Sequence, residues 1–426
     1  MPSSLKIYPS QRVINVFLRG FTMFSKLILI FFLIELFEPK DVGLWGMFVA
    51  TVATSALIIG GDYYSFSNRE LIGLNDKYKQ VDILKNQWTA YFFLYLILLP
   101  PQLMLFYYKF LPWEYLSWYF LILIVEHQSQ EMYRIIIALK HQISASVLLF
   151  VRYGIWVWIV LWIFLTYPES RSVKVLFQAW FIGGLFSLVA GIVVIKKSLG
   201  INFNKISNSN SNSNSNSNSK FNIIKGLKVS VVFFIATVFL KILFTSDKYI
   251  IDELGSDAEL AAYVFYTAIV FGIMNLLDPA IFSFLYPELV HHHKDSKRKL
   301  FESTVKELAT STAIISLVLG LLLVLGFHMY FLFRPNEIYQ SYEASFYTVV
   351  LAGLFFTWSM VPHFCIYAKG KDVYLLIATV ISTVVFILCV YFLNFFTSVI
   401  LSVSYSLLIA TILIFILKFL LYVKIK

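Results

Sequence analysis

The chain has 426 residues, of which 59% are hydrophobic and only 14% are charged, and its formal net charge is +10. Soluble domains carry about 25% charged residues, so this composition excludes a soluble globular protein and indicates a membrane protein that crosses the bilayer many times. The two cysteines, Cys365 and Cys389, lie in apolar segments and imply no disulfide framework.

Long apolar runs follow one another along the whole chain. A hydrocarbon core about 30 Å thick is crossed by about 20 helical residues, and backbone groups in lipid must find their hydrogen bonds within the segment. We therefore expect an all-α fold. Twelve spans are predicted, at residues 13–37, 43–67, 88–109, 115–139, 146–167, 174–195, 229–250, 259–286, 309–333, 344–367, 374–396 and 398–420.

Basic residues are unevenly distributed between the two sets of loops. Most lysines and arginines lie in the N-terminal segment, in the loops from even to odd spans and in the C-terminal segment. Cytoplasmic loops carry an excess of these residues. Both termini are therefore predicted to be cytoplasmic.

A low-complexity tract divides the spans into two sets of six. Residues 207–219 alternate serine and asparagine, a composition typical of a flexible coil with nothing to bury. The sequence thus predicts an N-terminal six-helix bundle at 1–200, a flexible cytoplasmic linker at 201–228 and a C-terminal six-helix bundle at 229–426.

The two halves also share a short pattern. Residues 65–71 and 283–289 both read S-F-x-x-x-E-L, 218 residues apart, at the ends of the second and eighth spans. Because six spans separate the copies, the two halves run in the same direction. Parallel repeats are a transporter architecture, with the substrate site between the halves near the middle of the membrane.

Four basic residues lie inside otherwise apolar spans: Arg19, Lys26, Arg152 and Lys241. A charge at this depth costs at least about 2.5–3.5 kcal/mol on insertion scales. One interpretation is that they line a cationic cavity and bind an anionic substrate, since arginine and lysine both bind phosphate oxygens. The other is internal neutralisation, in which Glu126 pairs with Arg152 or with Lys26.

Four acids are candidates for coupling transport to protons or another ion: Glu126, Asp278, Asp62 and Asp247. Buried carboxylates can exchange protons. Asp278 precedes a proline, which predicts a kinked helix in the eighth span. His363 is expected to be a core residue with its hydrogen bonds satisfied.

Several motifs of enzymes are missing from the sequence. It contains no GxxxxGK[ST] phosphate loop, no HExxH metal pair and no GxSxG elbow. We therefore expect a transporter with no cofactor, no metal site and no catalytic residues, driven by a proton or sodium gradient.

Three segments resemble one transporter family. They are Phe37–Trp45 between the first two spans, Gly60–Asp62 at the end of the second, and Ser246–Ile251, which is similar to a D-[RK]-Y-I-I pattern. On these segments and its twelve spans, the chain resembles the polysaccharide transporters of the multidrug/oligosaccharidyl-lipid/polysaccharide (MOP) superfamily. It is most similar to the O-antigen flippases often called Wzx.

The resemblance implies a MATE-like fold, with two parallel six-helix halves around a central cavity, in the bacterial cytoplasmic (inner) membrane. It implies movement of an undecaprenyl-diphosphate-linked oligosaccharide, such as an O-antigen repeat unit for lipopolysaccharide, from the cytoplasmic to the periplasmic leaflet by alternating access. Implied partners are that lipid, the membrane lipids, a polysaccharide polymerase and a chain-length regulator, and no nucleic acid.

Two other functions are open at this point. A multidrug or cation exporter of the same superfamily is the first, although a cationic substrate favours internal acids and the first span here carries two bases. A polysaccharide polymerase is the second, but such enzymes need a long outer loop, and the predicted outer loops are short.

Overall fold

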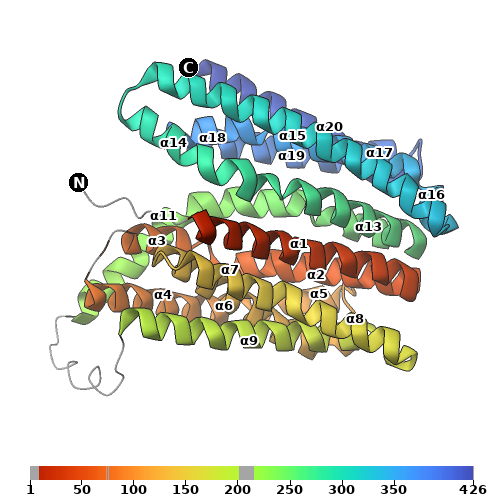
Figure 1. Ribbon diagram of the computed structural model, residues 1–426, viewed down its shortest axis with the longest axis horizontal. Coiled ribbons are helices and arrows are strands. Elements are labelled where there is room, and N and C mark those ends of the chain that lie inside the picture. Colours follow the sequence, from red (N-terminus) through yellow and green to blue (C-terminus); the bar gives the residue numbers. More distant parts are fainter. Residues whose placement is uncertain (1–8, 73, 75, 201–214, 426) are drawn as a thin grey trace. The chain divides into compact units, whose positions relative to one another are not determined.

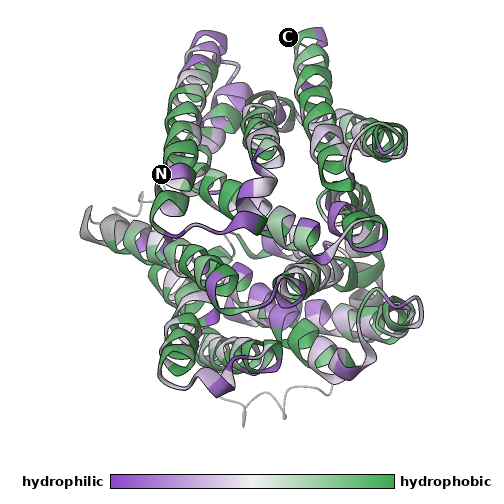
Figure 2. Ribbon diagram, turned by 90° about the vertical axis from the view of Figure 1, so that its right-hand side faces the viewer, coloured by the Kyte–Doolittle hydropathy of each residue, from purple (hydrophilic) through white to green (hydrophobic). Residues whose placement is uncertain are grey.

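The computed structural model describes residues 9–72, 74, 76–200 and 215–425 (Figure 1). All regular elements in this part of the chain are helices, and no strand occurs among the described residues. Hydrophobic residues occur on all parts of this helical structure, with hydrophilic residues interspersed among them (Figure 2). The predicted all-α class is confirmed.

The chain packs as two compact units, and three helices contribute to both. These helices are α1 (Pro9–Leu36), α2 (Pro39–Gly60) and α11 (Ser215–Leu243). As far as the residues are described, the first unit comprises Met1–Lys26 and Phe48–Phe234, and the second comprises Leu27–Met47 and Ile235–Lys426. The division at 1–200, 201–228 and 229–426 follows the membrane spans instead, and it stays a prediction.

The first unit contains short helices as well as long ones, because several spans are interrupted. Its remaining elements are α3 (Tyr64–Leu71), α4 (Lys77–Leu98), η1 (Pro100–Leu103), α5 (Met104–Tyr107), η2 (Trp113–Tyr115), α6 (Leu116–Ala138), α7 (Gln142–Phe150), η3 (Val151–Ile155), α8 (Trp156–Thr166), η4 (Pro168–Ser170) and α9 (Val173–Leu199).

The second unit is built in the same way from interrupted and continuous helices. Its remaining elements are α12 (Ser246–Leu254), α13 (Asp257–Met274), η5 (Asp278–Phe282), α14 (Ser283–Lys294), α15 (Arg298–Phe333), α16 (Glu337–Ser341), α17 (Glu343–Trp358), α18 (Met360–Ala368), α19 (Asp372–Leu393) and α20 (Val399–Lys424).

Each of the twelve predicted spans coincides with one or more of these helices. Ten described helical segments are long and apolar enough to cross a membrane. The other two predicted spans correspond to α6, which carries three charged residues among its 23, and to α11 with α12. The chain is therefore a multi-pass membrane protein, and the orientation of its termini stays a prediction.

Only part of the predicted linker at 201–228 lies among the described residues. Its residues 201–214 lie outside the described residues. Helix α11 begins at Ser215, so residues 215–228 are helical, and the role of 201–228 as a linker stays a prediction. Extending an existing helix costs much less than nucleating a new one, so the seventh span continues into the serine–asparagine tract.

Breaks in the spans fall where the local sequence favours them. Gly61 and Asp62 end the second span with φ of +55° and +50°, a backbone region that glycine enters without steric cost. The predicted kink before Pro279 is confirmed, because α13 ends at Met274 and a π-helical segment, η5, begins at Asp278.

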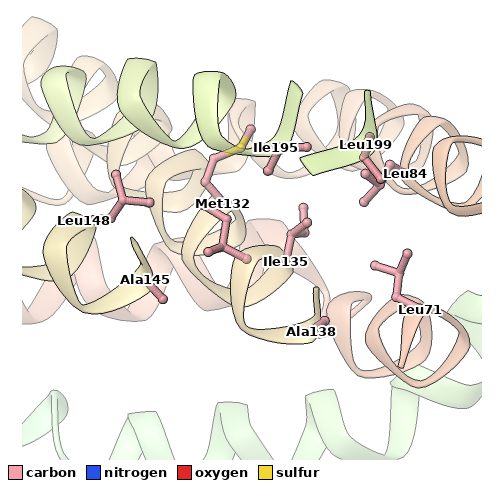
Figure 3. Close-up of a cluster of buried hydrophobic side chains, with 10 residues drawn as sticks. Leu71, Leu84, Met132, Ile135, Ala138, Ala145, Leu148, Ile195 and Leu199 are labelled. Carbon is pink, nitrogen blue, oxygen red and sulfur yellow. The ribbon is translucent and has the colours of Figure 1, made fainter. Parts of the chain in front are cut away.

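Small residues allow α9 to pack closely against α6 in the first unit. A Cβ atom added to Gly191 would lie 2.8 Å from the Cβ of Met132, and one added to Gly184 would lie 2.8 Å from a methyl group of Val125. Such contacts are the usual means of close helix packing in membranes. Met132 also belongs to a buried cluster with Leu148 and Ile195 (Figure 3).

We predict that Gly191→Ala destabilises the protein by about 1–3 kcal/mol, because the added methyl group must displace the Met132 side chain at its base. The measurement is thermal unfolding of the purified protein. Gly20→Ala in α1 is the matched control, since its Cβ would meet no atom within 4 Å. An equal unfolding temperature for both variants would contradict the packing role of Gly191.

Candidate functional site

An ion pair between Glu126 of α6 and Arg152 of η3 forms the centre of the polar interior of the first unit. Both residues are buried, with 5% and 3% of their surface exposed. The guanidinium donates from Nη2 to Oε1 at 2.6 Å and from Nε to Oε2 at 3.1 Å. It also donates from Nη2 to the backbone oxygen of Glu126 at 2.9 Å. Internal neutralisation, left open by the sequence, is thus what the geometry favours for Arg152.

Two further donors reach the same carboxylate. The Tyr153 hydroxyl donates to Oε1 of Glu126, and Nε1 of Trp180 donates to Oε2 at 3.3 Å. Tyr153 directly follows Arg152 within η3, which is a π-helix. A π-helical turn holds more residues than an α-helical turn and often occurs at functional sites. Here it brings two successive side chains to one carboxylate.

Lys26 is the third charged group of this cluster. Its Nζ lies 3.6 Å from the centre of the Tyr153 ring, a cation–π distance. The residue is near the middle of the apolar segment Phe17–Leu36, yet its side chain is exposed. No acidic residue in the described part of the chain forms an ion pair with it.

Arg19 occupies the same face of α1 as Lys26, seven residues earlier. It is half-buried, and its Nε donates to the hydroxyl of Ser146 in α7 at 3.3 Å. Among the described residues it has no carboxylate partner. Helix α1 therefore presents two bases that no described acid compensates.

A second buried carboxylate, Glu131, lies five residues after Glu126 on α6. It is fully buried and accepts from Arg134 Nη1 at 2.6 Å, from Gln87 Nε2 at 2.8 Å and from the Tyr91 hydroxyl. The arginine also lies over the Tyr64 ring, 3.5 Å from its centre. The polar residues of α6 gave a signal for this cluster, but the partners on α4 could not be chosen from the sequence.

The predicted coupling acids lie in different surroundings. Asp62, 4% exposed, follows the break after α2 in the first unit. In the second unit, Asp247 is 1% exposed, pairs with Lys248 at 3.2 Å and accepts from the Tyr263 hydroxyl at 3.0 Å. Asp278 is exposed at the start of η5. Lys241, also of the second unit, is half-buried.

The expectation for His363 is wrong, because its buried Nδ1 has no hydrogen-bond partner among the described residues. Lys418 of α20 interacts electrostatically with this histidine. Only 4% of the lysine is exposed, and within the described part of the chain it forms neither a hydrogen bond nor an ion pair. A buried amine without a partner is unusual. Its position inside the predicted span 398–420 was the signal for Lys418, which was not among the four candidate bases.

The fold is similar to that of solved MATE transporters. An inward-facing multidrug resistance MATE transporter of the MOP superfamily is 14% identical, with a TM-score of 0.67 and coverage of 99% of this chain and 96% of that chain. Its outward-facing counterpart is 13% identical, with a TM-score of 0.63 and coverage of 97% and 94%. A variant of a Vibrio cholerae MATE transporter is 13% identical, with a TM-score of 0.60 and the same coverage.

No family model matches the sequence, and no curated protein does. At these identities the likeness concerns the fold. The predicted MATE-like fold, which has twelve transmembrane helices in MATE transporters, is thereby confirmed.

We predict unequal effects on stability for the two bases around Tyr153. Arg152→Met leaves Glu126 buried without its counter-ion and should destabilise the protein by about 3–5 kcal/mol. Lys26→Met removes an exposed charge that no acid neutralises and should change stability by less than about 1 kcal/mol. Thermal unfolding, followed by the reaction of the buried Cys365 thiol with a dye, measures both. Equal losses would mean that Lys26 is also structural.

Lys418→Met should leave stability unchanged or increase it, because an apolar side chain of similar length replaces a buried amine that has no partner. The same unfolding measurement applies, with Lys371→Met, an exposed lysine before α19, as the control. A clear loss of stability in Lys418→Met alone would show that the amine has an important partner.

Proposed function

We propose that the chain is a transporter that moves a polyprenyl-diphosphate-linked oligosaccharide from the cytoplasmic to the periplasmic leaflet. The observation that carries this proposal is Lys26, an exposed residue near the middle of a membrane span whose ammonium forms no ion pair with a described acid. A charge facing acyl chains at that depth is costly. Water and an anionic ligand are the surroundings that favour it.

Under this proposal, the residues of α1 meet the diphosphate. Lys26 supplies a mobile point charge and Arg19 a guanidinium that can hold two phosphate oxygens at once. Arg152 holds Glu126 and positions the π-helix, and Lys241 is the candidate base of the second unit. The glycan passes through an aqueous cavity while the polyprenyl chain stays in lipid, since sugar hydroxyls without hydrogen bonds are costly in hydrocarbon.

The proposal places the protein in the cytoplasmic membrane, where a proton or sodium gradient drives alternating access. Asp62, Asp247 and Asp278 are the acids proposed to bind the coupling ion, and Glu126, the fourth candidate from the sequence, is instead held by Arg152. A polymerase and a chain-length regulator for the same glycan are the proposed protein partners.

Export of drugs or other cations is the second candidate, and the fold supports it, because the similar structures include multidrug resistance transporters. A cation exporter needs an accessible acid in its site. Glu126 and Glu131 are both buried and both paired with arginine. Arg19 and Lys26, the two bases in the interior of the first span, form no ion pair with a described acid, which favours an anionic substrate.

We predict that Lys26→Met lowers the rate at which the lipid-linked repeat unit reaches the periplasmic leaflet by about tenfold. One charge-assisted hydrogen bond contributes about 1.5–3 kcal/mol, and 1.4 kcal/mol corresponds to a factor of ten. The measurement is a leaflet assay with a glycan-binding probe on cells that express each variant at equal protein level.

Lys371→Met serves as the matched control in this assay, because Lys371 is an exposed lysine outside the spans. Cells that lack the protein should keep the repeat unit on the cytoplasmic side. Normal periplasmic exposure of the repeat unit in those cells would contradict the flippase proposal, and changed drug susceptibility instead would support the cation exporter.

A further inference from the structure

The carboxylate of Glu126 has no acceptor site left for Lys26. An ionised carboxylate offers about four lone-pair sites on its two oxygens. Oε1 accepts from Arg152 Nη2 and the Tyr153 hydroxyl, and Oε2 accepts from Arg152 Nε and Trp180 Nε1. All four sites are thus occupied by donors other than lysine.

Lys26 nevertheless interacts electrostatically with this carboxylate and with Arg152. Its Nζ lies over the face of the Tyr153 ring, 3.6 Å from the ring centre. A charge-assisted hydrogen bond to a carboxylate is stronger than a cation–π contact. If an acceptor site on Glu126 were open, the flexible lysine side chain would therefore be drawn to it.

Tyr153 contacts both Glu126 and Lys26. Its hydroxyl fills an acceptor site on Oε1 of Glu126, and its ring holds the ammonium of Lys26. Lys26, Arg152 and Glu126 together carry one net positive charge. That surplus resides on Lys26, because Arg152 is bound to the acid through two nitrogens.

We propose that Tyr153 is a positioning residue that keeps the charge of Lys26 available for a phosphate group by excluding Lys26 from Glu126. This inference rests on the function proposed above and deepens it. It assigns to the first unit a site for one anionic phosphate group. The hydroxyl of Tyr153 then determines the affinity for that anion without having to touch the substrate.

The test uses Tyr153→Phe, which keeps the ring and removes the hydroxyl. Lys26 should then move to the vacated site on Oε1 and lose its availability. The probe is farnesyl diphosphate, with farnesol as its uncharged counterpart, bound to the purified full-length protein in lipid nanodiscs. We expect affinity for farnesyl diphosphate to fall about tenfold, as in Lys26→Met, and affinity for farnesol to stay unchanged.

A double variant separates this mechanism from simple structural damage. Tyr153→Phe combined with Lys26→Met should bind no more weakly than either single variant, because both remove the same charge. The weakening of binding by salt should decrease equally in all three variants. Additive losses, or a loss of farnesol binding, would overturn the inference.

The remaining outcomes show whether the role of Tyr153 fails alone or together with the proposed function. Wild-type affinity in Tyr153→Phe together with weak binding in Lys26→Met would overturn the role of Tyr153 and leave the function standing. Wild-type affinity in Lys26→Met would overturn both. Tyr119→Phe removes the hydroxyl of another buried tyrosine, which bonds Ser55 and Gln102, and it should bind the probe as the wild type does.

Discussion

The polar interior of the first unit depends on the compensation of buried charge. A charge taken out of water is tolerated when it is paired and its remaining hydrogen-bonding sites are filled. Glu126 and Glu131 on α6 meet this condition in the same way, each with one arginine and one tyrosine hydroxyl. Two acids five residues apart on one helix are thus stabilised in the same way, although burying either carboxylate without a partner would cost free energy.

This pairing determines which bases stay available. Arg152 and Arg134 are bound by the acids of α6, so neither can serve a ligand without leaving a carboxylate exposed to apolar surroundings. The bases of α1 are not bound in this way. Arg19 contacts a serine and Lys26 an aromatic ring, partners that orient a cation without cancelling its charge. The acids of α6 therefore act on function indirectly, by engaging the arginines and leaving the bases of α1 available.

The sequence predicted the helices well and the site only in part. The length of each apolar run fixes where a span can lie, so all twelve predicted spans coincide with helices, and Pro279 marked a real interruption. Composition did not indicate that residues 215–228 are helical, because it describes a segment by itself and α11 is continuous with a span. The pairing of Glu126 with Arg152 was one of two options in the sequence. The decision between them depends on the π-helix at Val151–Ile155, which no spacing rule indicates.

Glu131, Tyr91 and Tyr153 show what sequence reasoning cannot reach. Glu131 belongs to the conspicuous polar stretch of α6, whereas Tyr91 and Tyr153 are ordinary residues for their segments, and the importance of all three comes from partners on another helix. In the second unit, Lys418 and His363 also interact across two helices, but no described acid takes part. Lys418 is buried and Lys26 is exposed, although both are lysines in apolar spans that no described acid neutralises. The two lysines differ in the exposure of the residue, because a ligand can approach Lys26 on its exposed side, whereas buried Lys418 affects chiefly the stability of its own helices.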